Sequence, residues 1–344
     1  MNVATVGTNP LTGSAIMSIL KEKGMDFTAV KQPIPNVANA YRDANNNLVI
    51  PACDVDTGFF TIQNGDRIFN AGVKKSYEIL QYTDTFASLQ DIAKVTDTNL
   101  VNAGLWNKGA EAYVQFDIGE FEIGNGTGDK IMKRLTAISS HSSKFAFLIM
   151  ITPYRLWCAN QVTGMKATAK KDIKQAIKSS MRIKHTSNGH ELINNIGSWL
   201  SIVDGQFKDL ENLYNRLNNI RVTDHDMIAK VLGTVFNVQK DSERSKTMVR
   251  NQLESFANRF NSADGGKVDK NTAWNLYNSL QGTFQHDPIK STVTHDKSVL
   301  IGAVAEKARS AMDIILDVCA NKNTDPSMYP VDNDIQLLLK EFTF

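Results

Sequence analysis

The stretch Ala112-Tyr113-Val114-Gln115-Phe116-Asp117-Ile118 alternates in character from one residue to the next. Ala112, Val114, Phe116 and Ile118 occupy every second position. A period of two residues places these four side chains on one face of an extended chain. The stretch therefore predicts a strand with one buried face and one exposed face.

Further extended segments are predicted on both sides of this strand, at residues 58–63, 131–139, 145–151 and 154–160. Glycine, asparagine and aspartate in residues 124–129 predict a turn, because these residues tolerate a left-handed backbone. A short helix over residues 86–94, capped by Thr83 or Asp84, is expected between the strands. Residues 41–162 therefore predict an antiparallel meander with one inserted helix.

The spacing of apolar residues changes to three and four after residue 164. Such spacing predicts helices, at residues 165–184, 190–220, 224–236, 242–260, 270–283 and 297–320, with residues 264–267 as a loop. A helix over residues 12–23, ended by Gly24, is expected near the N-terminus. Residues 31–35 contain two prolines and are expected to interrupt regular structure.

The fold class predicted is α+β, with an antiparallel β-meander core and inserted helix followed by a mostly α-helical C-terminal half. Four segments are expected. They are an N-terminal helix and extended arm (1–40), an α+β core ending in a basic helix (41–186), a helical region (187–320) and a C-terminal tail (321–344).

Composition narrows the class of protein. Of the 344 residues, 42% are hydrophobic and 22% are charged, which is ordinary globular composition. The net charge of +2 excludes a protein that is strongly charged as a whole. The cysteines Cys53, Cys158 and Cys319 are too scattered for a disulfide framework or a zinc site. Residues 1–20 lack the pattern of a secretory signal, and the apolar stretch 145–151 is too short to span a bilayer. We expect a cytoplasmic protein that does not bind membranes.

One segment stands out electrostatically. Between Thr163 and His185 there are seven basic residues and one acidic residue, Asp172. The basic residues are Lys166, Lys170, Lys171, Lys174, Lys178, Arg182 and Lys184. On a helix, the spacing of four would place most of them on one face, which suits a phosphate backbone. A solvated helix face is the alternative, because lysine is the ordinary surface residue.

Other side chains offer weaker candidates. Aromatic rings that would stack on bases, if exposed rather than in the core, are Trp106, Tyr113, Tyr154, Trp157 and Trp274. Residues 124–130 lack the spacing of a phosphate loop, and no two histidines have metal-binding spacing. We therefore expect no cofactor, no resident metal and no catalytic residue that local sequence reveals.

Several short motifs, taken in order, resemble the phage/plasmid-like protein family, a family defined as a domain of unknown function. They lie at residues 75–81, 103–109, 140–143, 153–160, 183–186 and 272–286. The resemblance implies a phage, plasmid or other mobile element and a DNA partner. It adds Arg155 to the nucleic-acid-binding candidates. It also marks a polar set, His141, Asn160, His185, Trp274 and His286.

The motif residues Arg155, Asn160, His141, Lys184 and His185 are expected near one end of the sheet. Two interpretations stay open for them: a buried hydrogen-bond network, or a group of phosphate contacts. The order of elements is also similar to that of single-strand annealing proteins of the Red-beta type, by architecture alone.

Three functions are therefore considered. The first is a non-enzymatic, homo-oligomeric binder of nucleic acid, in particular single-stranded DNA, acting in recombination or strand annealing. The second is an interaction or anti-defence factor that binds a host protein. The third is a metal-dependent nuclease or hydrolase. Its candidate groups are His141, His185, His286, Asp54, Asp56 and Asp117.

Overall fold

The structure, a computed structural model, describes residues 13–34, 40–49, 59–89, 99–124, 126–155, 160–161, 180–186, 188–189, 191, 200–236, 243–266, 268–286 and 292–320. The predicted α+β class is confirmed: the strands are antiparallel and most helices follow residue 200. No helix in these ranges is both long and apolar enough to cross a membrane.

The chain forms two compact units that are not consecutive in sequence. The first contains residues 1–118, 135–150 and 180–203, and the second contains residues 119–134, 151–179 and 204–344. Strands β7 (Glu111–Ile123) and β8 (Asp129–Ser140) run from one unit into the other. Each unit is described by itself below.

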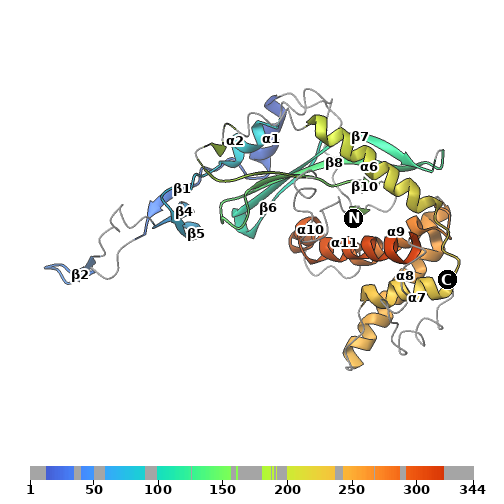
Figure 1. The fold of residues 1–344 in the computed structure, drawn as a ribbon. Coiled ribbons are helices and arrows are strands. Elements are labelled where there is room, and N and C mark those ends of the chain that lie inside the picture. The colour runs from blue at the N-terminus through green and yellow to red at the C-terminus, as the bar shows by residue number, and fades with distance from the viewer. Residues whose placement is uncertain are drawn as a thin grey trace. The chain divides into compact units, whose positions relative to one another are not determined.

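Strand β7 is a central strand in the sheet of the first unit, between β6 (Asn99–Trp106) and β8. Strand β6 pairs antiparallel with β7, and the two are joined by a 3-10 turn, Asn107–Gly109. Strand β8 follows β7 in the sheet (Figure 1). The order continues to β9 (Phe147–Ile151) and β12 (Ser180–Ile183). The predicted strand is thus confirmed, but its half-buried character is wrong. Residues 111–116 are all buried, so both faces of this part of β7 are covered.

A smaller sheet forms the N-terminal part of this unit. Strand β4 (Phe59–Asn64) lies between β1 (Val30–Pro33) and β5 (Arg67–Lys74). The predicted interruption at residues 31–35 is therefore wrong for Lys31 to Pro33. A proline is tolerated there because β1 is an edge strand and Pro33 is its last residue. A two-stranded hairpin, β2 (Tyr41–Arg42) and β3 (Leu48–Val49), lies between β1 and β4 in sequence.

Two helices accompany these sheets. Helix α1 (Gly13–Glu22) confirms the predicted N-terminal helix, and Gly24, at φ 67°, follows its end. Helix α2 (Tyr82–Ala87) begins four residues before the predicted start at residue 86. Neither Thr83 nor Asp84 caps it; the N-cap residue is Gln81, whose side chain instead bonds to the backbone of Ala29. The burial of Tyr82 and Phe86 anchors the helix.

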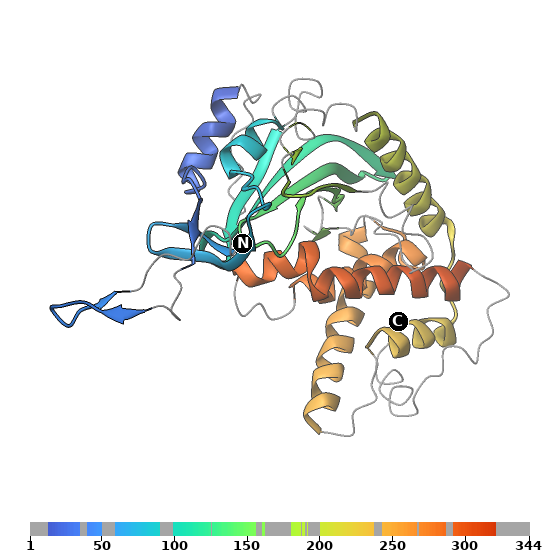
Figure 2. The same ribbon diagram turned by 60° about the vertical axis from the view of Figure 1, so that its left-hand side comes forward.

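The second unit is mostly helical. Its helices are α6 (Leu200–Asn219, whose first turn belongs to the first unit), α7 (His225–Phe236), α8 (Glu243–Gly266), α9 (Ala273–His286), α10 (Thr292–Ile301) and α11 (Ala303–Ile315), followed by a π-helical turn, η5 (Leu316–Ala320). Helix α9 packs against α8 and α11 (Figure 2). Helix α9 is buried over nearly its whole length, which makes it the core element of this unit.

Two predictions for these helices are wrong. Asp264, Gly265 and Gly266 belong to α8 rather than to a loop. The single helix expected over residues 297–320 is broken at Gly302, which has extended backbone angles and caps α11. A Cβ on Gly302 would lie 2.8 Å from the Cα of Ser298, so only glycine allows the two helices to meet so closely.

The ends of β7 and β8 in the second unit carry a small extension. Strand β10 (Tyr154–Arg155) pairs with β8 and with β11 (Asn160–Gln161). The single strand predicted for residues 154–160 is therefore a pair of short antiparallel strands. This extension brings Arg155 next to Ile131 of β8.

Candidate nucleic-acid interface

The basic segment singled out by sequence ends in a strand. Lys166, Lys170, Lys171, Lys174 and Lys178 lie outside the described residues. Residues Ser180–Ile183 form β12, so the predicted helix over residues 165–184 is wrong at this end. Strand β12 is an edge strand that pairs with β9, placing Arg182 opposite Leu148.

Burial along β12 follows the alternation of a strand. Ile183 and His185 are buried, whereas Arg182 and Lys184 are exposed. Because side chains two residues apart share a face, both cations point away from the core. The two-residue spacing of Arg182 and Lys184 thus places both side chains on one side of the chain. The four-residue spacing of the lysines was expected to do the same on a helix.

Further cations lie beside this strand. The backbone N–H of Glu78 donates to the carbonyl of His185, and the rings of Tyr77 and His185 stack with their centroids 4.9 Å apart. The Lys31 ammonium donates to the carbonyls of Lys75 and Tyr77, each at 2.8 Å. These contacts bring Lys31 of β1, residues 75–78 after β5, and His185 after β12 into one region.

We call this region the basic edge; it consists of Lys31, Lys75, Arg182 and Lys184. All of these residues except the half-buried Lys31 are exposed. One carboxylate, Glu78, is exposed among them. Four cations against one anion attract a polyanion, because a phosphate backbone gains from several neighbouring cations at once.

Arg155, the remaining candidate cation, is not on a surface. Its side chain is fully buried in the second unit, and its Nε donates to Asp129 Oδ1 at 2.6 Å. The other oxygen of Asp129 accepts from Trp274 Nε1 at 2.7 Å. A phosphate cannot reach a guanidinium in that position, so for Arg155 the buried hydrogen-bond network is the interpretation that the geometry supports.

Aromatic packing completes this network. The Trp274 ring lies 4.8 Å from the ring of Tyr214, and the Arg155 guanidinium lies 5.9 Å from the Trp274 ring centroid. Burial raises the pKa of Tyr214 well above its ordinary value. Sequence reasoning missed Asp129, which it treated as part of a turn, because nothing local marks a partner 145 positions away.

Two of the three histidines of the motif set, His141 and His185, belong to the first unit. His141 is buried against the ring of Tyr82, at a centroid distance of 3.9 Å, with Phe27 and Phe69 around it. Burial lowers the pKa of His141 to about 3 and that of His185 to about 4. Both are therefore neutral near pH 7, and His185 Nδ1 lies 3.2 Å from the carbonyl oxygen of Glu78.

The motif residues are divided between the two units. His141 and His185 lie in the first unit, and Asn160, Trp274 and His286 lie in the second. Asn160 pairs through its backbone with Arg155, while His286 is exposed at the end of α9. The expected gathering of Arg155, Asn160, His141, Lys184 and His185 at one end of the sheet concerns both units and stays a prediction.

Most aromatic candidates for base stacking are core residues. Trp106, Tyr113 and Trp274 are buried. Tyr154 is half-buried, with the Arg134 guanidinium 4.0 Å from its ring centroid. Trp157 lies outside the described residues. Among the residues that the structure describes, the exposed aromatic rings are instead Tyr41 and Phe59, which sequence reasoning did not select.

The groups considered for a metal centre are dispersed. Within the described ranges, no three or more histidine, cysteine or carboxylate side chains are placed to hold a metal ion. Asp54 and Asp56 lie outside those ranges, and Asp117 is on β7.

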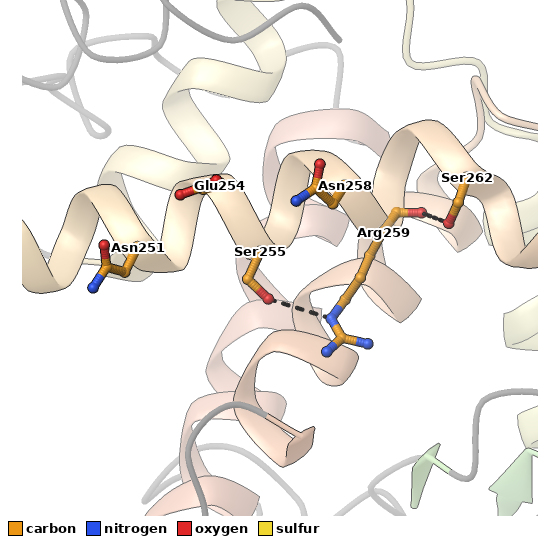
Figure 3. Close-up of a pocket in the computed structure, with 6 residues that line it drawn as sticks. All are labelled: Asn251, Glu254, Ser255, Asn258, Arg259 and Ser262. Carbon is orange, nitrogen blue, oxygen red and sulfur yellow. Dashed lines mark hydrogen bonds between the residues drawn. The ribbon is translucent and has the colours of Figure 1, made fainter.

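A polar hollow of about 440 Å³ lies along helix α8 in the second unit (Figure 3). Its lining residues are Asn251, Glu254, Ser255, Asn258, Arg259 and Ser262. The Arg259 Nε donates to Ser255 Oγ at 3.4 Å. A Cβ on Gly282 of α9 would lie 2.8 Å from the Arg259 Cδ, so the glycine makes room for the arginine. Because one carboxylate and one guanidinium both belong to the lining, the hollow has no marked preference for anions.

Comparison with known families gives one match. The model of a family described as "Domain of unknown function (DUF932)" matches residues 71–311. No curated protein and no solved structure matches the chain.

Proposed function

We propose, for a chain that belongs to the DUF932 family of domains of unknown function, that the basic edge of the first unit binds single-stranded nucleic acid. The observation that carries the proposal is the exposure of Arg182 on β12 and of Lys184, which directly follows that strand. Lys31 donates to the carbonyl of Lys75, the nearby backbone N–H of Glu78 donates to the carbonyl of His185, and five more lysines precede β12 in sequence.

The chemistry of the edge suits a phosphate backbone rather than a small anion. The cations come from three segments that are distant in sequence, at residues 31, 75 and 182–184. The terminal ammonium and guanidinium groups of lysine and arginine bind phosphate without reading base sequence. Binding is therefore weakly sequence-specific and weakens as salt rises, since each neutralised phosphate releases counterions.

The setting of this activity is part of the proposal. The motif resemblance supports a protein of a phage, plasmid or other mobile element, acting in the cytoplasm of its host. A binder of this kind would act in recombination or strand annealing, as a homo-oligomer.

Charge reversal tests the proposal. Fluorescence anisotropy is measured with single- and double-stranded oligonucleotides for the unmodified protein and for R182E/K184E. We expect the variant to bind single strands at least about tenfold more weakly, because two attractive contacts become repulsive. The variant K208E/K307E makes the same change in net charge on exposed residues of the second unit and is expected to bind like the unmodified protein.

Two results would overturn the proposal: no binding by the unmodified protein at low salt, or equal weakening in both variants. Unfolding midpoints of both variants show whether the fold is retained. Specific capture of a host protein that resists nuclease treatment, together with absent oligonucleotide binding, would instead favour an interaction factor.

A further inference from the structure

The small sheet β1-β4-β5 has one packed face and one open face. On the packed face, Ile62 and Val73 form a buried cluster with Ala29. Phe27, Phe60 and Phe69 are partly buried against this cluster. Because side chains alternate along a strand, the neighbours of these residues must lie on the other face.

The strand register identifies that open face. Phe59 lies opposite Lys74, Gln32 opposite Thr61, and Gln63 between Val30 and Ile68. The hydroxyl of Thr61 is 3.3 Å from both the carbonyl of Gln32 and Oε1 of Gln63, which confirms that these three residues are neighbours. We call Val30, Gln32, Phe59, Thr61, Gln63, Ile68 and Lys74 the open face.

Apolar side chains are unusually exposed there. Phe59 is 53% exposed and Ile68 is 57% exposed. Phe59 is paired directly with Lys74 in the strand register, so the two side chains share this face, while amides and a hydroxyl occupy its centre. No carboxylate belongs to the open face, and the nearest acidic residue in sequence, Asp66, lies in the turn between β4 and β5.

These groups match the chemistry of an unpaired nucleotide. An exposed aromatic ring stacks on a base of any type, because every base has a π-face, and a lysine beside it pairs with the phosphate. Glutamine and threonine side chains donate and accept hydrogen bonds at base edges. A duplex hides its base faces, so this arrangement favours single strands.

A second copy of the chain fits this sheet less well. Antiparallel self-pairing of the edge strand β5 would bring Lys74 of one copy near Arg67 of the other. Like charges placed opposite each other destabilise a strand pair. Charge complementarity therefore favours a polyanion as the occupant.

We infer that the open face of the β1-β4-β5 sheet is a stacking platform for single-stranded nucleic acid, with a base on Phe59 and its phosphate at Lys74. The inference rests on the proposed function and names the surface that reads unpaired bases. Phe59 precedes residue 71, where the family match begins, so the platform extends the binding surface beyond the matched residues.

The test compares an intact oligonucleotide with one in which several bases are replaced by abasic sites, as DNA and, in a parallel arm, as RNA. The proteins are the unmodified chain, F59A and F59W. Matched control M248A truncates an exposed apolar side chain of the second unit. We expect F59A to bind the intact strand about tenfold more weakly and the abasic strand equally well, because the lost contact is with a base. F59W should retain binding to the intact strand.

Two outcomes overturn the inference while leaving the proposed function intact. In one, F59A binds the intact strand as tightly as the unmodified protein, with salt-sensitive binding preserved. In the other, the unmodified protein does not distinguish intact from abasic strands. If the unmodified protein binds neither strand at low salt, both the inference and the proposed function fail.

Discussion

Asp129 and Arg155 form a buried ion pair in which the arginine Nε lies 2.6 Å from the carboxylate. Arg155 on β10 lies next to Ile131 of β8 in the strand register, so the pair ties β10 to the start of β8. The second carboxylate oxygen accepts from Trp274 of α9. One carboxylate thus connects strand β10 and helix α9 within the second unit.

Removing this carboxylate should strongly destabilise the second unit. Asp129→Ala leaves the Arg155 charge buried without its partner, and we expect the free energy of unfolding to fall by about 3–5 kcal/mol. Chemical denaturation monitored by tryptophan fluorescence measures the change. The adjacent Lys130→Ala breaks an exposed pair with Glu120 and should leave the midpoint unchanged.

A double substitution separates the ion pair from simple packing. In D129A/R155M both charges are removed, and much of the stability lost in D129A should return, because the unpaired buried charge is gone. An unfolding free energy for D129A equal to that of the unmodified protein would show that the pair contributes nothing.

Acid should destabilise the first unit through its buried histidines. The pKa of His141 is about 3 and that of His185 about 4 when folded, against an ordinary value near 6.5. The unfolded chain therefore binds more protons below pH 6.5. The stability contributed by the neutral histidines is complete above pH 6.5 and is lost as the pH falls toward 4 and then 3. At about pH 4.5, the shifted pKa of His141 alone should lower the free energy of unfolding by about 3 kcal/mol relative to pH 7.

The variant His141→Phe tests this assignment. Phenylalanine retains the stacking with Tyr82 but cannot be protonated. We expect the loss of unfolding free energy between pH 7 and about pH 4.5 to be smaller in H141F than in the unmodified protein, by about 3 kcal/mol. Identical pH profiles for the two proteins would refute the role of His141.

Gly104 allows close packing of an aromatic ring across two strands. A Cβ at this position of β6 would lie 2.7 Å from Cε1 of Tyr113, whose ring stacks on Trp106. We expect Gly104→Ala to lower the free energy of unfolding by about 1–3 kcal/mol, because the ring must move within a packed core.

Truncating the ring should remove that conflict. In a Tyr113→Ala background, the further change Gly104→Ala should lower the free energy of unfolding much less than it does in the unmodified protein. A double-mutant cycle in thermal or chemical unfolding measures this coupling. Additive losses would mean that the Tyr113 ring does not constrain position 104.

Regular periodicity was enough to predict much of the fold. Strand β7 and helices α7 and α9 occur near the predicted positions because their apolar residues repeat over many positions. Strand β12 was mistaken for the end of a helix. The four-residue spacing of the preceding lysines predicted a helix that continues through residue 184. The strand shows only a short alternation, in which Met181 and Ile183 alternate with Arg182 and Lys184.

The candidate site was harder to predict, since its parts meet only in the folded chain. Lys31 approaches Lys75 and Tyr77 through pairing of β1, β4 and β5, which no local pattern shows. The exposure of Phe59 depends on which face of β4 packs inward. For Arg155, in contrast, a phosphate contact and a buried network both stayed open, because its partner Asp129 is remote in sequence; the structure shows the side chain buried against Asp129.

The salt dependence of binding tests the central claim most directly. Affinity of the unmodified protein for single-stranded DNA is measured over a series of salt concentrations. If the basic edge neutralises about three or four phosphates, the logarithm of the association constant should fall with the logarithm of salt concentration with a slope of about −2 to −3. In R182E/K184E the slope should be shallower by about 1 or more. Binding that is independent of salt, or a slope unchanged by the charge reversal, would contradict a phosphate-binding role for this edge.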